Sequence, residues 1–196
     1  MSQLIESIKV ENRCLQHIEW HNKRFNEARR ELFGIQTAIK LEELIAIPHC
    51  LDNKVYKCRI VFQKEIKKIE FEPYQIRSVK KVKLLHAPTI DYHLKYLDRT
   101  AINDLYKLRE TADDILIVQN GYITDCSYAN VVFFDGSTWL TASTFLLNGT
   151  QRQRLLFEGK IKEKEIKYTD LDHFTKAKPI NAMLDFETTQ TFEIIK

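Results

Sequence analysis

Apolar and polar side chains alternate with a period of two in several segments of the first half of the chain. Residues 4–10 and 13–18 flank a short turn in which Asn12 supplies the tight geometry, so they predict a hairpin. Residues 55–62 alternate over their whole length, and residues 66–71 continue the pattern as a partner strand. The pattern therefore predicts an antiparallel sheet.

A helical period replaces this alternation between residues 21 and 33. Phe25, Ala28 and Leu32 fall at i, i+3 and i+7, and Gly34 is a natural C-terminal stop. The spacing predicts a helix with one apolar face. The same criteria predict helices at residues 40–47, 98–109, 150–157 and 170–176.

Short apolar runs separated by turn residues fill the second half of the chain. The Asn120-Gly121 and Asp135-Gly136 pairs are typical of tight turns between strands. The predicted strands are residues 82–85, 115–119, 122–124, 130–134, 138–141, 180–186 and 191–195. The four between residues 115 and 141 follow one another as a meander. We therefore expect an α+β protein with two domains, 1–86 and 87–196.

Length and charge narrow the classes of protein that fit. The chain has 196 residues, 44% of them hydrophobic, which is enough for one large domain or two small, tightly packed ones. The 30 Lys and Arg against 27 Asp and Glu leave a net charge of +3, too small to argue for nucleic acid as a partner. Basic residues at 64–68 and 80–83 alternate with apolar ones, which favours solvated strand faces.

Cysteines and histidines follow no metal-binding pattern. The 4 cysteines lack C-x-x-C spacing and are predicted to be free thiols, which favours a reducing compartment. No metal is assigned to the histidines that form no pair at ligand spacing, namely His17, His49, His86, His93 and His173. A secretory leader and an apolar run of the ~18 residues that a membrane span needs are both missing. We expect a cytoplasmic protein without a membrane partner.

Three further segments contain, in the order of the sequence, a lysine amine, a carboxylate and a turn that starts with a glycine. They are LKYLDR (residues 94–99), NGYITDCSYAN (residues 120–130) and LNGTQR (residues 147–152). An unprotonated lysine amine can condense with an aldehyde, and a carboxylate can keep a ring nitrogen protonated. Backbone N–H groups that open a helix can hold a phosphate. Because pyridoxal phosphate carries an aldehyde, a ring nitrogen and a phosphate, the segments predict a site for this cofactor.

The order of these motifs resembles class IV of the pyridoxal-phosphate enzymes, which contains branched-chain and D-amino-acid aminotransferases and aminodeoxychorismate lyase. Residues 5–10 (IESIKV), with Leu15 and the His21-x-x-Arg24 pair, resemble the family's opening hairpin and helix. Residues 180–184 (INAML) resemble the closing strand of the lyase branch. The resemblance implies a two-part α+β fold, with an N-terminal antiparallel sheet with helices and a C-terminal barrel-like α/β half. The chain resembles a short member of the family.

The same resemblance implies roles for individual residues. Lys95 would bind the cofactor covalently and carry protons as acid and base. Asp125 stands where the family has Glu, opposite the ring nitrogen, and Thr150 lies one place earlier than the family's hydroxyl. The other residues implied in cofactor binding are Arg24, Asn130, Gly149, Gln151, Asn181 and Ala182.

Each assignment has a simpler alternative. Lys95 could be an ordinary solvated lysine, Asp125 an aspartate at the end of a turn, and Arg24 a surface arginine on a charged helix. Asn148 or Thr150 could cap the helix that the third segment opens.

The resemblance favours an enzyme that labilises a bond at the α-carbon of an amino compound. Residues 94–99 and 181–183 are similar to aminodeoxychorismate lyase, which eliminates pyruvate and leaves 4-aminobenzoate for folate. One alternative is an aminotransferase for D- or branched-chain amino acids, and another is a non-catalytic binding module of the same fold. The chain is shorter than typical members in its N-terminal half, so the substrate stays open.

A symmetric homodimer is a further implication of the resemblance. Several apolar residues of the second half supply surface that a second copy could cover. They are Phe133, Phe134, Trp139, Phe145 and Leu146. The alternative is that these side chains fill the core of their own domain.

Overall fold

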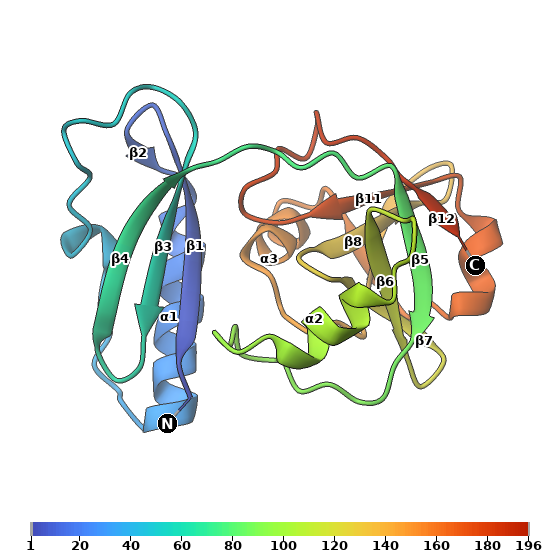
Figure 1. Ribbon diagram of the computed structural model, residues 1–196, viewed down its shortest axis with the longest axis horizontal. Helices are drawn as coiled ribbons and strands as arrows, with labels where there is room; N and C mark the ends of the chain where they lie inside the picture. Colours follow the sequence, from blue (N-terminus) through green and yellow to red (C-terminus); the bar gives the residue numbers. More distant parts are fainter. Residues whose placement is uncertain (1, 196) are drawn as a thin grey trace. The chain divides into compact units, whose positions relative to one another are not determined.

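The computed structural model describes residues 2–195, which form two compact units (Figure 1). The first unit holds the chain up to Ile76 together with Leu94–Asp98, and the second holds Arg77–His93 and the chain from Arg99 onward. The sequence suggested a single boundary near residue 86. The strand at residues 81–86 groups with the second unit because both of its neighbours in the sheet belong there.

An antiparallel sheet of four strands forms the first unit, as the alternation predicts. In the order β2-β1-β3-β4, its strands are β1 (Leu4–Glu11), β2 (Cys14–Leu15), β3 (Tyr56–Phe62) and β4 (Ile66–Pro73). Asn12 and Arg13 turn the first hairpin with φ of 50° and 58°. Positive φ at both central residues matches the right-handed twist of the strands that the turn joins.

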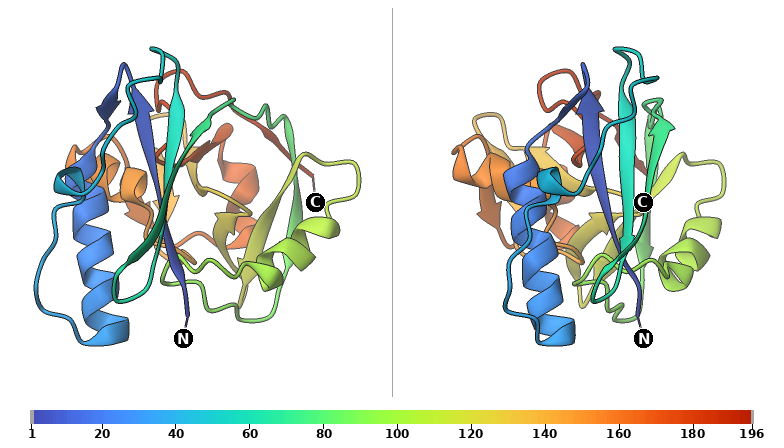
Figure 2. Two further views of the ribbon diagram at one scale, coloured as in Figure 1. Left: turned by 60° about the vertical axis from the view of Figure 1, so that its left-hand side comes forward. Right: turned by 90° about the vertical axis from the view of Figure 1, so that its left-hand side faces the viewer.

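Helix α1 (Ile18–Phe33) covers one face of this sheet (Figures 1 and 2). It begins earlier than residue 21, the predicted start, and ends at Gly34, whose φ of 70° is the left-handed conformation of a helix stop. Phe25 packs on Phe62 of β3 with ring centroids 4.4 Å apart. The apolar stripe read from the sequence is therefore the face that the sheet covers.

A second helix in the first unit, predicted at residues 40–47, is wrong. Only a 3-10 turn forms there, η1 (Leu41–Glu43). Ile45 and Ile47 are β-branched, and Pro48 disfavours the helical conformation in the residue before it. The segment therefore cannot continue as an α-helix beyond its first turn.

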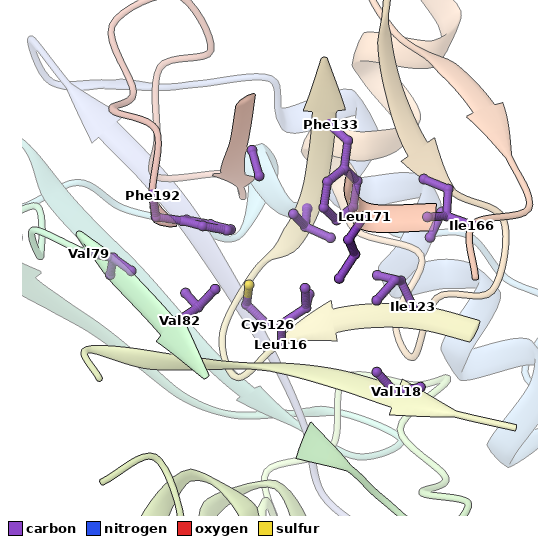
Figure 3. Close-up of a cluster of buried hydrophobic side chains, with 13 residues drawn as sticks. Val79, Val82, Leu116, Val118, Ile123, Cys126, Phe133, Ile166, Leu171 and Phe192 are labelled. Atoms are coloured by element: carbon purple, nitrogen blue, oxygen red, sulfur yellow. The ribbon is translucent and has the colours of Figure 1, made fainter. Parts of the chain in front are cut away.

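Two sheets of four strands build the second unit. The sheet β12-β5-β6-β7 contains β5 (Lys81–His86), β6 (Asp114–Gln119), β7 (Tyr122–Cys126) and β12 (Glu193–Ile195). The sheet β10-β9-β8-β11 contains β8 (Asn130–Phe134), β9 (Trp139–Ala142), β10 (Lys162–Lys164) and β11 (Lys176–Ile180). Leu116 and Cys126 of the first sheet meet Phe133 of the second in one buried core (Figure 3).

This arrangement corrects the predicted meander. β6 and β7 pair as one hairpin and β8 and β9 as another, but the two hairpins belong to different sheets. The chain changes sheet in the turn where the Cys126 N–H donates to the Ala129 carbonyl at 2.8 Å. Alternation records which side of a strand is buried and carries no information on which sheet the strand joins.

The second unit also contains the helices α2 (Thr100–Lys107) and α3 (Thr150–Phe157) and the 3-10 helix η2 (Tyr168–His173). α3 has the predicted bounds. The strand predicted at residues 180–186 is wrong beyond Ile180, because Asn181 Oδ1 accepts the Met183 N–H and turns the chain. The helix predicted at residues 170–176 is replaced by η2. Within residues 2–195, no helix combines the length and the apolar character needed to cross a membrane.

Candidate cofactor site

Lys95 lies in the short segment that returns to the first unit and runs along β1. The Ile5 N–H donates to the Lys95 carbonyl at 2.9 Å, and the Leu97 N–H donates to the Gln3 carbonyl at 2.8 Å. Leu94, which directly precedes Lys95, is buried in the core of the first unit. The backbone around Lys95 is therefore fixed, whereas its side chain is half-buried. A lysine on a rigid, partly desolvated segment suits covalent chemistry better than an ordinary surface lysine does.

A buried charged cluster joins β1 to α1 in the same unit. Glu6 accepts Nε–H and Nη2–H of Arg24 at 2.8 and 2.6 Å, and its other contact is Nδ1 of His21 at 2.7 Å. Burial alone would raise the pKa of Glu6, but Arg24 and His21 bring it down to about 2, so the carboxylate is ionised. An ionised carboxylate only accepts, so His21 donates from Nδ1. His21 thus holds the helix to the sheet.

Lys95 belongs to the electrostatic surroundings of this cluster. Burial lowers the pKa of His21, Glu6 opposes that change, and the positive charges of Arg24 and Lys95 lower it further. The imidazole is therefore neutral at pH 7. In the first unit, two of the residues implied by the resemblance, Arg24 and Lys95, thus both lie close enough to His21 to lower its pKa.

In the second unit, Asp125 lies at the end of β7 with 5% of its surface exposed. Asn130 Nδ2–H donates to its Oδ1 at 2.7 Å, and the N–H groups of Leu146 and Leu147 donate to its Oδ2 at 3.1 and 3.0 Å. Burial raises the pKa of Asp125 to about 6 even though these donors, with Arg152, act in the opposite direction. Asp125 is thus a buried carboxyl held in one orientation, unlike a solvated aspartate at a turn.

Asn130 fixes Asp125, and Gly149 makes room for Asn130. The Asn130 amide donates to the Leu147 carbonyl at 2.8 Å as well as to Asp125, which fixes which way the amide points. A Cβ added to Gly149 would fall well inside contact distance of Asn130 Oδ1. The glycine of the turn is therefore required by a side chain of the protein itself, a reason that the sequence alone does not disclose.

Helix α3 begins at Thr150, and its N-cap residue is Gly149, with no side-chain cap, so neither Asn148 nor Thr150 is the cap. Asn148 Oδ1 instead accepts from the Arg152 guanidinium at 3.1 Å. The first backbone N–H groups of a helix have no partner inside the helix, and Thr150 and Gln151 supply two of them here. Because the dipole of the helix also favours negative charge at this end, the start of α3 suits a phosphate.

Arg152, the last residue of the same turn, has a structural role. It is 2% exposed and donates to the Ala142 carbonyl at 3.1 Å, forms an ion pair with Glu163 and lies 4.2 Å from the Phe145 ring centroid. These contacts tie the start of α3 to β9 and β10. The arginine of the motif therefore positions the turn.

Asn181 and Ala182 follow β11 at the end of the sheet where Asn130 starts β8, since Ile180 and Asn130 are partners across the two strands. Asn181 Nδ2–H donates to the Tyr128 carbonyl at 3.5 Å, in the loop that follows Asp125. The second unit thus brings together Asp125, Asn130, Gly149, Thr150, Gln151, Asn181 and Ala182. The amide of Gln151 donates to the carbonyl of Leu184, two residues beyond Ala182, at 3.4 Å.

Sequence reasoning missed Glu6 as a member of the site. The signal was present, because Glu6 falls in the apolar phase of β1 between Leu4 and Ile8, where a carboxylate must be paired. Among residues 2–195, no three His, Cys, Asp or Glu side chains gather as the ligands of a metal ion do.

Comparisons with known proteins show the family and the fold to which the chain is similar. The family model described as amino-transferase class IV matches residues 59–186. An uncharacterized protein of Haemophilus influenzae is 40% identical over 186 residues, which cover 93% of this chain and 98% of that protein. The crystal structure of a Haemophilus somnus 129PT protein, proposed to be a 4-amino-4-deoxychorismate lyase, has a TM-score of 0.86 at 32% identity. That match covers 93% of this chain and 97% of the other.

A hypothetical aminotransferase of Mycobacterium tuberculosis in its PLP-bound form has a TM-score of 0.77 at 15% identity, covering 97% of this chain and 80% of that one. This likeness concerns the fold. Fold and site together define a class IV scaffold of the kind on which pyridoxal-phosphate enzymes are built. The chain belongs to the class IV aminotransferase family. Relatives of similar length exist, since the chain spans nearly the whole of both Haemophilus proteins.

Proposed function

We propose that this protein is a pyridoxal-phosphate-dependent enzyme that acts on an amino compound. Its leading reaction is the elimination carried out by aminodeoxychorismate lyase, which releases pyruvate and leaves 4-aminobenzoate. Lys95 carries the proposal, because its backbone is bound to β1 next to the buried Glu6–Arg24 pair. The lyase reaction is supported by the 32% identity with the Haemophilus somnus protein, which is itself proposed to be such a lyase.

The residues present fit the chemical groups of the cofactor. In the second unit, the uncapped start of α3 suits a phosphate. In the first unit, the guanidinium of Arg24 is a charge-assisted donor of the kind that binds one. Asp125, fixed by Asn130, suits a protonated ring nitrogen, which would in turn favour the ionised carboxylate. When bound, pyridoxal phosphate withdraws electrons from the α-carbon of the amino compound. Lys95 would accept the proton that leaves this carbon and return it.

The first test is covalent capture of the cofactor. Pyridoxal phosphate added to the purified protein should give a visible absorbance band that borohydride bleaches, and mass spectrometry should find the pyridoxyl group on Lys95. Lys95→Ala should lose the band and keep the fold, whereas Lys9→Ala, in an ion pair with Glu11 on β1, should keep both. An adduct on a different lysine would contradict the assignment.

The second test separates the two reactions of the family. A lyase should release pyruvate from 4-amino-4-deoxychorismate without a keto acid. An aminotransferase should instead need a keto acid and convert the cofactor band to that of pyridoxamine phosphate when an amino acid is added. The aminotransferase is the second candidate because the M. tuberculosis fold neighbour is a hypothetical aminotransferase. A protein that binds the cofactor and does neither would be the non-catalytic member of the fold.

A further inference from the structure

Glu6 is a charged residue at a position where packing favours an apolar one. It is 1% exposed, between Leu4 and Ile8 on the face of β1 that α1 covers. An apolar side chain of similar volume often serves a buried position as well as or better than an ion pair. Packing alone therefore does not explain the Glu6 carboxylate, and we infer that it has a further role.

The hydrogen bonds of Glu6 fix one edge of the Arg24 guanidinium. Oε1 accepts from Nε at 2.8 Å and Oε2 accepts from Nη2 at 2.6 Å, which is a bidentate contact. A guanidinium has five N–H donors in a rigid plane, so this contact leaves both hydrogens of Nη1 and one of Nη2 on the opposite edge. The Arg24 side chain is 11% exposed, so the group is not fully enclosed.

His21 completes the arrangement without adding charge. It donates from Nδ1 to Glu6 Oε2 at 2.7 Å, and burial keeps the imidazole neutral. The carboxylate therefore has two fixed neighbours, of which Arg24 alone is a cation. This holds the plane of the guanidinium in a single orientation relative to β1 and α1.

We propose that Glu6 is a positioning residue for the cofactor phosphate, which it serves by orienting Arg24 so that the Nη1 edge is ready to bind an anion. The inference rests on the proposed function, because the anion is the phosphate of pyridoxal phosphate. Preorganisation strengthens binding by removing the cost of ordering a flexible cation when the ligand arrives. Loss of Glu6 should therefore weaken the binding of pyridoxal phosphate and leave the binding of pyridoxal, which lacks the phosphate, nearly unchanged.

The test compares two ligands that differ only in the phosphate. Dissociation constants for pyridoxal phosphate and for pyridoxal are measured by absorbance titration for the wild type, Glu6→Gln and Arg24→Lys. Both variants should weaken pyridoxal phosphate by about tenfold or more, since a charge-assisted contact is lost, and change pyridoxal by less than about twofold. Glu72→Gln, which removes a carboxylate from an ion pair with Lys57 in the same sheet, should change neither.

Equal weakening of both ligands would show that Glu6 acts on the fold in general and would overturn the inference, as would unchanged binding of both. Glu6→Gln added to Arg24→Lys should cause little further loss, because the two residues act through one contact. If Glu6→Gln does not fold, Glu6→Asp takes its place, because it keeps the charge and shortens the reach. A wild type that binds no pyridoxal phosphate contradicts the proposed function itself, whereas normal binding by Glu6→Gln contradicts only the role of Glu6.

Discussion

At the scale of one residue, hydrogen bonds fix the orientation of the Asp125 carboxyl, but they do not bring its pKa down to the ordinary value. Three N–H groups donate to it, yet burial still keeps its pKa near 6. A positive group nearby, such as a protonated ring nitrogen, would lower this pKa.

The first prediction concerns stability against pH. The pKa of Asp125 is higher in the folded protein, about 6, than its ordinary value of 3.8. The stabilisation of the folded state that comes from protonated Asp125 is thus fully present below pH 3.8, and it is lost as the pH rises through 6. Relative to Asp125→Asn, the cofactor-free wild type should lose about 3 kcal/mol of unfolding free energy between about pH 3 and pH 8, at about 1.4 kcal/mol per pKa unit. Urea unfolding at several pH values measures the difference, and parallel curves for the two proteins would contradict it.

Asp125→Asn should also separate binding from reaction. The variant removes the charge that, under the proposed function, would keep the ring nitrogen protonated, but it leaves a polar side chain of the same size. We expect the rate to fall by about a hundredfold or more, the range of a lost electrostatic contact in a reaction, and the dissociation constant for pyridoxal phosphate to change far less. Titration of the cofactor band and steady-state kinetics on the same preparations check this. A loss in binding as large as the loss in rate would mean that Asp125 serves to hold the cofactor.

Residue types at the site could be read from the sequence, but their contacts could not. Lys95, Asp125 and Asn130 stand in motifs whose spacing is visible in the chain. The pairing of Glu6 with Arg24 joins residues 18 apart, on a strand and a helix whose facing sides are known only once both have packed. The alternation of β1 carried a signal that Glu6 is buried, which sequence reasoning did not use, and only the structure shows what pairs with it.

At the scale of elements, the turn before α3 depends on a glycine for a reason that can be tested. An alanine Cβ at residue 149 would collide with Asn130 Oδ1, so Gly149→Ala should destabilise the protein by about 1–3 kcal/mol, as overpacking does. The same change should weaken cofactor binding, because displaced Asn130 releases Asp125. Thermal and urea unfolding measure the first effect and absorbance titration the second.

A double variant provides the control for this prediction. Asn130→Ala removes the atom that the new Cβ would meet, so adding Gly149→Ala to it should cost little more. Equal costs in both backgrounds would show that the strain comes from the backbone of residue 149. That outcome would be unexpected, because Gly149 has an ordinary φ of −63°.

Elements with a strong local signal were predicted well, and those set by distant partners were not. The period of α1, its stop at Gly34 and the bounds of α3 follow from neighbouring residues. The division of β6–β7 and β8–β9 between two sheets depends on partners far away in the chain, such as β5 and β11. Met183, Leu184 and Phe186 made residues 181–186 look like a strand, but these apolar side chains are buried from an irregular turn.

At the scale of the whole molecule, apolar composition proved a weak guide to assembly. Phe133 and Leu146 are 0% and 6% exposed within the second unit, and the Phe134 and Trp139 rings lie 5.2 Å apart. Trp139 also packs on Phe186, with centroids 6.0 Å apart. Phe133 and Leu146 are therefore core residues of their own unit, whereas Phe134, Trp139 and Phe145 are partly exposed. The group as a whole therefore gives no independent support for a dimer.

We nevertheless expect a symmetric homodimer with the active site near the subunit contact, an expectation that rests on the family resemblance. Light scattering coupled to size exclusion at micromolar concentration should give a mass near twice the 23.2 kDa of one chain. Because a ligand that binds the assembled form stabilises it, added pyridoxal phosphate should shift any monomer towards the dimer and raise the unfolding temperature. The Lys95→Ala variant is the matched control, since it should dimerise without the covalent contribution of the cofactor. A cofactor-loaded protein that stays monomeric on dilution and still turns over an amino substrate would rule out a site that depends on a second copy.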